Sequence, residues 1–178
     1  TFDGNKFAIQ ALEKGCAYAI IDEPILDNLA HLDNLKSLED LEDLGYPRNR
    51  LILVNDCLQT FKDVAREHRR QFNIPVIGIT GTNGKTTTKE LIAAVLSKKC
   101  NVLYTQGNFN NDVGVPKTLF RLTKDHKIAV IEMGASHPGD IKTLAETAEP
   151  TCGLITNVGR AHLQGFGSFE GVIKTKCE

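Results

Sequence analysis

The sequence reads Gly78-Ile79-Thr80-Gly81-Thr82-Asn83-Gly84-Lys85-Thr86-Thr87 directly after a short apolar run. An apolar strand that ends in glycines and is followed by a helix is the setting of a phosphate-binding loop. Glycines let backbone N–H groups converge on phosphate oxygens, and the helix N-terminus adds free donors and partial positive charge. The segment therefore predicts a nucleotide site. The alternative is a glycine-rich turn followed by a chance Lys-Thr-Thr.

Within this loop each polar residue has an expected role. Lys85 is expected to reach the β- and γ-phosphates, and Thr86 to ligate Mg²⁺. Ile79 stands where the general pattern has glycine, so the segment is a variant loop with glycines at 78, 81 and 84. The predicted nucleotide-binding residues are Gly81, Thr82, Asn83, Gly84, Lys85, Thr86 and Thr87.

Strands and helices are expected to alternate on both sides of the loop. Apolar and β-branched runs predict strands at 75–80, 101–105, 128–132 and 151–156. Helices are expected at 85–96, with Leu91, Ile92, Val95 and Leu96 buried, at 116–122, and at 138–148 with a proline in the first turn. This order predicts a parallel sheet with right-handed crossovers and helices on both faces. Ligands of such sheets bind at the carboxyl ends of the strands.

Two candidate metal ligands follow strands at that edge. Glu132 ends the strand 128–132 and can ligate Mg²⁺ directly or through water, although an acid at a strand end can also be merely solvated. His162 follows the strand 151–156, where a metal ligand and a structural hydrogen-bonding histidine are equally good interpretations.

A third loop at the same edge is rich in asparagine. Residues 107–116 follow the strand 101–105, and they offer hydrogen-bond donors and acceptors to a polar substrate through Asn108, Asn110 and Asn111. Asparagine and glycine are also the residues of an ordinary turn, so the segment alone allows both interpretations.

The region before residue 73 predicts a separate, smaller unit. A helix capped by Asn5, strands at 17–21 and 51–54, and a helix at 58–70 form an α/β pattern. Between them leucine recurs every third residue from 26 to 44, a spacing that fits two short helices better than one regular helix. The sequence therefore predicts an α/β fold: a small α/β N-terminal domain, 1–73, with an acidic leucine-rich insertion at 26–50, followed by a parallel-sheet P-loop domain, 74–178.

Composition narrows the class of protein. The 178 residues include 21 Lys+Arg and 22 Asp+Glu, for a net charge of −1, which argues against a nucleic-acid binder. Acidic residues concentrate between Asp22 and Asp43, so the remainder is mildly basic and suits an anionic small ligand. No apolar run approaches the roughly 18 residues of a membrane span. Five scattered cysteines without a CxxC pair indicate reduced thiols in a cytoplasm.

Four segments in this order resemble the Mur ligase family. They are GTNGKTT at 81–87, YTQGNFNNDVGVP at 104–116, VIEMGASHPGDI at 130–141 and ITNVGRAHLQGFGSFEG at 155–171. The opening residues 2–15 also resemble the N-terminal, UDP-substrate-binding domain of the family. The resemblance extends over nearly the whole chain and is weak over 26–50, which looks inserted.

The resemblance implies an ATP-dependent ligase that forms an amide bond through an acyl phosphate in peptidoglycan precursor synthesis. The implied partners are UDP-N-acetylmuramoyl-tripeptide and D-alanyl-D-alanine, and the implied cofactors are ATP and two Mg²⁺ ions. By position, Thr86 and Glu132 hold one ion, His162 helps to hold the second, and Lys176, with Lys174 as the alternative, carries a carbamate. The resemblance thus makes Lys85, Glu132, His162 and Lys176 the expected catalytic residues of a cytoplasmic, monomeric enzyme.

Other functions share parts of this pattern. Another Mur ligase or a folylpolyglutamate synthetase-like ligase has the same loop and glutamate, and a non-catalytic nucleotide-binding module could use the acidic leucine tract as a docking surface. The family pattern also implies parts of the ATP domain, and a further domain, that are absent here. We therefore expect the 178 residues to hold a truncated ATP domain without ligase activity of their own.

Overall fold

The computed structural model describes residues 4–22, 50–159 and 163–178, in two compact units that span 1–60 and 61–178. In the first unit, a 3₁₀ turn η1 (Asn5–Phe7) leads into helix α1 (Ala8–Glu13), and strands β1 (Ala19–Ile21) and β2 (Leu51–Leu53) pair in parallel. The predicted helix cap by Asn5 is wrong. Its side-chain amide instead donates to Asp22 Oδ1 at 2.7 Å, and its carbonyl oxygen accepts from the Asp22 N–H at 3.2 Å.

Two expectations about the first unit stay predictions. The leucine repeat at 26–44, and nearly all of the proposed insertion at 26–50, lie outside the described residues. The domain boundary between 73 and 74 is also untested. The two compact units divide between Thr60 and Phe61, inside helix α4 (Cys57–Arg70).

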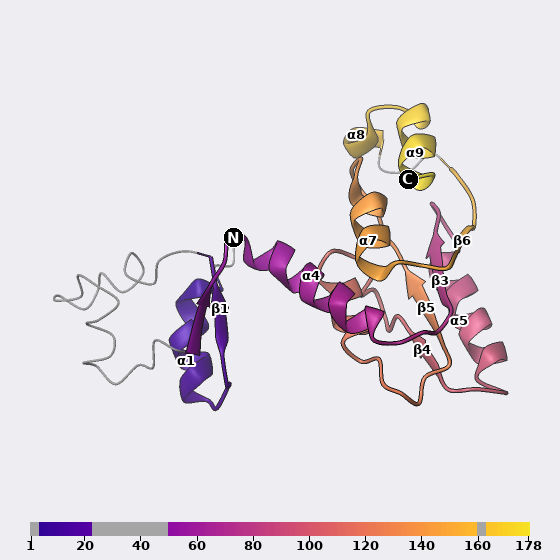
Figure 1. Ribbon diagram of the computed structural model, residues 1–178. Coiled ribbons are helices and arrows are strands. Elements are labelled where there is room, and N and C mark those ends of the chain that lie inside the picture. The colour runs from indigo at the N-terminus through magenta and orange to yellow at the C-terminus, as the bar shows by residue number, and fades with distance from the viewer. Residues whose placement is uncertain (1–3, 23–49, 160–162) are drawn as a thin grey trace. The chain divides into compact units, whose positions relative to one another are not determined.

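The second unit is built on a four-stranded sheet, which confirms the predicted parallel arrangement (Figure 1). Strands β3 (Val76–Thr80), β4 (Val102–Tyr104), β5 (Ile128–Glu132) and β6 (Cys152–Ile155) run parallel in the order β4-β5-β3-β6. Ile79 pairs with Glu132 and Thr80 pairs with Ile155. The segments that follow β3, β5 and β6 therefore leave the sheet at the same edge.

Apolar side chains alternate between the two faces of this sheet, and each face is covered by helices. On one face Ile79, Val130 and Val102 pack with Ala93 of helix α5 (Lys85–Leu96). On the other face, residues such as Leu103 and Ile131 pack with helices α6 (Gly114–Leu119) and α7 (Asp140–Ala148) and with Ala65 of α4. Glu132 continues the alternation of Val130, so its side chain belongs to the α5 face.

Helix α5 has the predicted bounds but not the predicted buried face. Leu91 and Val95 are 63% and 70% exposed, whereas Lys89 is fully buried. Ile92 and Leu96 do pack against the core, as expected. The difference arises because the inward face follows Lys89, Ile92, Ala93 and Leu96, and the sequence pattern treats a lysine as a surface residue.

Other elements shift by a few residues from their expected positions. Pro138 lies before α7 rather than in its first turn, because Gly139 adopts φ 88° at the helix N-cap. Near the C-terminus, short helix α8 (Leu163–Phe166) precedes α9 (Phe169–Lys176), whose N-cap Ser168 accepts from the Gly171 N–H at 3.0 Å. None of the described helices has the length and apolar character needed to cross a membrane.

Candidate functional site

The glycine-rich loop between β3 and α5 has the backbone geometry that a phosphate site requires. Gly81 adopts φ 140° and Gly84, the N-cap of α5, adopts φ 78°, conformations that L-residues with a side chain rarely take. A Cβ atom at residue 81 would lie 2.1 Å from Thr156 Oγ1, so the close approach of the two loops also requires glycine. The Lys85 ammonium donates to the carbonyls of Gly81 and Thr82 at 2.7 and 3.1 Å. Lys85 therefore lies against the loop at the start of the helix.

The segment after β6 holds the loop in place. Thr156 Oγ1 and Asn157 Nδ2 donate to the Asn83 carbonyl at 2.6 and 3.1 Å, and Asn157 Oδ1 accepts from the Asn83 N–H at 3.1 Å. The Thr82 N–H donates to the Asn157 carbonyl at 3.0 Å. Sequence reasoning did not give Thr156 and Asn157 a role in shaping the loop. Their position after a strand at the same sheet edge is the signal that could have found them.

Glu132 meets the loop across the sheet edge. The carboxylate is 1% exposed, and its Oε1 accepts from Thr86 Oγ1 at 3.1 Å and from Asn110 Nδ2 at 2.9 Å. Its backbone N–H donates to Thr105 Oγ1 at 2.9 Å. Glu132 Oε2 is buried and has no hydrogen-bond donor among the described residues.

This arrangement fits a magnesium ion. One hydroxyl and one carboxylate lie next to a phosphate loop, and Mg²⁺ typically takes one or two protein ligands together with phosphates and waters. Within the described residues, no three acidic, histidine or cysteine side chains are grouped as a metal cage. The residues present therefore suit a metal that arrives with a nucleotide.

A second buried charge lies behind Glu132. Lys89, fully buried on α5, donates to the Thr105 carbonyl at 2.6 Å and contacts Glu90 Oε1 at 2.7 Å. Its ammonium is 3.9 Å from Glu132 Oε2. Sequence reasoning missed Lys89, although its spacing of three residues from Thr86 places both on one face of a helix.

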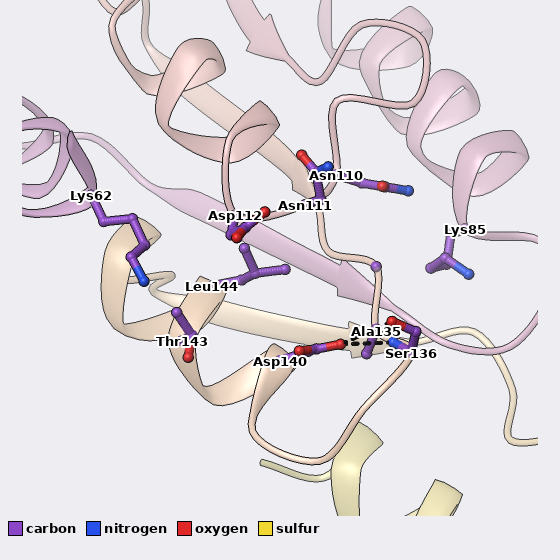
Figure 2. Close-up of a pocket in the computed structure, with 11 residues that line it drawn as sticks. Lys62, Lys85, Asn110, Asn111, Asp112, Ala135, Ser136, Asp140, Thr143 and Leu144 are labelled. Carbon is purple, nitrogen blue, oxygen red and sulfur yellow. Dashed lines mark hydrogen bonds between the residues drawn. The ribbon is translucent and has the colours of Figure 1, made fainter. Parts of the chain in front are cut away.

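The asparagine loop contributes to an open pocket of about 570 Å³ that begins at Lys85. Figure 2 shows Asn110, Asn111 and Asp112 on one side of this pocket, Ser136 and Asp140 at another, and Lys62 of α4 at the far end from Lys85. Asn111 Oδ1 also accepts from the Gly114 N–H at 2.8 Å at the start of α6. Asn108 is exposed and does not line the pocket. The structure thus brings Asn110 and Asn111, but not Asn108, to the pocket wall.

The two candidate lysines near the C-terminus have different surroundings. Lys176 is 4% exposed and lines a small cavity with Gly81, Thr82, Lys85 and Phe166. Burial lowers the pKa of Lys176 below 10.5, and the charge of Lys85 lowers it further, against a smaller opposite effect of Asp140 and Glu178. Lys174 is exposed. His162 lies outside the described residues.

Comparison with known proteins connects this site to a family of enzymes. Residues 79–178 match the Mur ligase middle domain. The whole chain is 44% identical to the UDP-N-acetylmuramoyl-tripeptide–D-alanyl-D-alanine ligase of Synechocystis sp., and 99% of it aligns with the Escherichia coli ligase of that name at 39% identity.

Solved structures agree with the sequence relatives. A crystal structure of MurF from Acinetobacter baumannii superimposes with a TM-score of 0.82 at 34% identity over 98% of this chain. The MurF ligase of Thermotoga maritima in complex with ADP gives a TM-score of 0.80 at 35% identity, also over 98%. The chain spans about a third of the length of these relatives: 36% of the Synechocystis ligase and 34% of the Acinetobacter structure.

Proposed function

The chain belongs to the Mur ligase family, and from this membership we propose that the protein joins D-alanyl-D-alanine to UDP-N-acetylmuramoyl-tripeptide with the consumption of ATP. The observation that carries the proposal is the contact between Thr86 and Glu132 at the mouth of the phosphate loop, beside a pocket that starts at Lys85. The relatives that match over the full chain bear the name of this reaction. We also propose that the enzyme is cytoplasmic and monomeric.

In this proposal the loop holds ATP and the pocket holds the acceptor. The backbone N–H groups at the start of α5 and the Lys85 ammonium bind the phosphates, and the loop after β6 fixes their position. Thr86 and Glu132 would hold a magnesium ion, which would supply neutralisation of the phosphate charge. Asn110 keeps the Glu132 carboxylate oriented through its 2.9 Å hydrogen bond. The 570 Å³ pocket beyond Lys85 is of the size that ligand sites commonly have.

The proposed chemistry has two steps. A carboxylate oxygen of the tripeptide attacks the γ-phosphorus, the bond to the bridging oxygen of ADP breaks, and an acyl phosphate forms. The amine of D-alanyl-D-alanine then attacks the acyl carbon, loses a proton, and displaces inorganic phosphate. Because phosphoryl transfer depends mainly on positioning and charge neutralisation, these residues need not bond covalently to the substrate.

We propose Lys176 rather than Lys174 as the carbamate-bearing lysine, and His162 as its companion near a second Mg²⁺ ion. Two features of Lys176 support this assignment. The cavity that it lines reaches Gly81 and Lys85, and its lowered pKa increases the fraction of neutral amine, the form that adds carbon dioxide. A carbamate supplies oxygen ligands where an ammonium would repel a metal.

An assay of the complete reading frame that contains this chain tests the proposal. We expect amide formation and phosphate release with ATP, UDP-N-acetylmuramoyl-tripeptide and D-alanyl-D-alanine, and a loss of at least about a hundredfold in kcat/KM in Lys85→Ala and Glu132→Gln. Lys99→Met, which changes an exposed lysine away from the loop, is the matched control. Turnover with glutamate or with the preceding dipeptide precursor as the preferred substrate would instead indicate a different ligase. ATP binding that is unchanged in both site variants would support a non-catalytic module.

A further inference from the structure

Helix α5 carries a fully buried cation that the proposed mechanism leaves without a role. All of the Lys89 side chain is removed from solvent, and its ammonium donates to the Thr105 carbonyl at 2.6 Å. A buried ammonium group destabilises a protein unless it is paired and hydrogen-bonded. Lys89 meets both conditions, and its buried charge lies next to the Glu132 carboxylate.

The relation between Lys89 and Glu132 is electrostatic rather than a hydrogen bond. Lys89 Nζ and Glu132 Oε2 are 3.9 Å apart, beyond the usual hydrogen-bond distance. The ammonium donates elsewhere, to the Thr105 carbonyl and towards Glu90, while Glu132 Oε2 has no donor among the described residues. The lysine therefore balances the carboxylate charge without occupying its lone pairs, which stay available to a metal.

The local charges decide when a metal can bind. Lys85 and Lys89 lie one helical turn apart on α5 and contribute two positive charges, against the single buried negative charge of Glu132. Glu90 contacts Lys89 but is half exposed, so water weakens its field at Glu132 more than it weakens the field of the fully buried Lys89. A divalent cation that approaches Glu132 without a nucleotide is repelled by the Lys89 ammonium, 3.9 Å from Glu132 Oε2, and by Lys85 at the start of the same helix. The phosphates of a bound nucleotide offset this repulsion.

We propose that Lys89 is a positioning residue that makes metal binding at Glu132 depend on the nucleotide. Its fixed charge keeps the Glu132 site from holding a divalent cation until phosphates occupy the loop, so metal and nucleotide are taken up together. The inference rests on the proposed function, because it assumes a nucleotide at this loop. A purely structural lysine, which only ties α5 to the end of β4, would affect stability without affecting metal binding in the absence of nucleotide.

A Mn²⁺ binding experiment tests this inference. Binding is monitored through the electron paramagnetic resonance signal of the free Mn²⁺. The full-length protein is titrated with Mn²⁺ with and without a non-hydrolysable ATP analogue. Binding at the Glu132 site is the difference between each protein and its Glu132→Gln counterpart, which removes contributions from other sites. Lys89→Met is the test variant. Glu90→Gln, which keeps the Lys89 charge, and Lys99→Met, which removes an exposed charge, are the matched controls.

In the native protein and both controls we expect Glu132-dependent Mn²⁺ binding only with the analogue. In Lys89→Met we expect it without the analogue, with an affinity at least tenfold above native, or about 1.4 kcal/mol. If Lys89→Met does not show this gain in affinity, the inference is overturned. The inference is also overturned if the native protein shows Glu132-dependent Mn²⁺ binding without nucleotide. This second measurement does not require Lys89→Met to fold. Native protein that lacks Glu132-dependent binding with the analogue contradicts the proposed function instead.

Discussion

At the scale of single residues, the two oxygens of Glu132 have different surroundings. Oε1 accepts hydrogen bonds from Thr86 and Asn110, which fix the orientation of the carboxylate, whereas Oε2 faces Lys89 at 3.9 Å without a bond. Strand position alone could place Glu132 at the sheet edge. The three-residue spacing from Thr86 could place Lys89 on the helix face that carries Thr86, but nothing in a helical pattern marks a charged residue as buried.

Lys176 and Lys174 offer a residue-scale test of the second metal site. In the full-length protein we expect Lys176→Ala to lower kcat at least about a hundredfold, because it removes the proposed metal ligand. Lys174→Ala should leave kcat within about twofold, because the Lys174 side chain is exposed and replacing an exposed side chain away from a functional site changes the protein little. Activity measured with and without added bicarbonate provides the second readout. Recovery of the activity of Lys176→Ala by short-chain carboxylic acids would support the carbamate. Equal losses of kcat in Lys176→Ala and Lys174→Ala would contradict the assignment.

At the scale of elements, the loop between β3 and α5 depends on two glycines for different reasons. Gly81 combines φ 140° with a neighbouring hydroxyl that leaves no room for a side chain, whereas the space around Gly84 at φ 78° is open. The sequence indicates that glycines are needed here but not which of them is sterically confined, because Thr156 approaches from a segment 75 residues away in the chain.

Alanine substitutions at these two glycines form a matched pair of variants. Gly81→Ala should lower the free energy of unfolding by about 3 kcal/mol or more, because backbone strain adds to the overlap with Thr156. Gly84→Ala should lower it by about 1–2 kcal/mol, the cost of a left-handed conformation for an L-residue. Urea denaturation without nucleotide measures both values. Similar losses in the two variants would show that the loop backbone moves to accommodate the extra carbon.

The ends of α4 and α7 are joined by an ion pair that responds to pH. Arg70 donates to both carboxylate oxygens of Glu149, and this interaction holds the pKa of Glu149 below 4.5. A lowered pKa means that the pair stabilises the folded state above about pH 4.5 and that this stabilisation is lost as the pH falls through the lower, folded-state pKa. Because both groups are partly exposed, its contribution is about 1 kcal/mol at most.

Replacement of Glu149 tests this dependence. Glu149→Gln should lower the free energy of unfolding by about 0.5–1 kcal/mol at pH 7, with the difference from the native protein vanishing at low pH. Glu146→Gln is the control on the same helix, because its contact with Lys142 is longer, at 3.9 Å, and exposed. Denaturation curves across the acid range provide the comparison. A difference that persists unchanged below the folded-state pKa would argue against the ion pair.

At the scale of the whole molecule, the alternation of strands and helices was sufficient to predict the parallel sheet and the edge at which the loops gather. The bounds of β5 and α5 follow the sequence closely, because β-branched runs and the loop mark them. The buried face of α5 and the division between Thr60 and Phe61 were not predictable. The first depends on a buried charge, and the second lies within a continuous helix. That these 178 residues alone lack ligase activity stays a prediction.

The most direct test of the proposed reaction follows one oxygen atom. UDP-N-acetylmuramoyl-tripeptide is prepared with heavy oxygen in the acceptor carboxylate and supplied to the full-length protein with ATP and D-alanyl-D-alanine. If the carboxylate attacks the γ-phosphorus at the loop around Lys85, one labelled oxygen leaves with each inorganic phosphate, which mass spectrometry detects. Amide product accompanied by unlabelled phosphate would contradict an acyl phosphate and, with it, the assignment of this site.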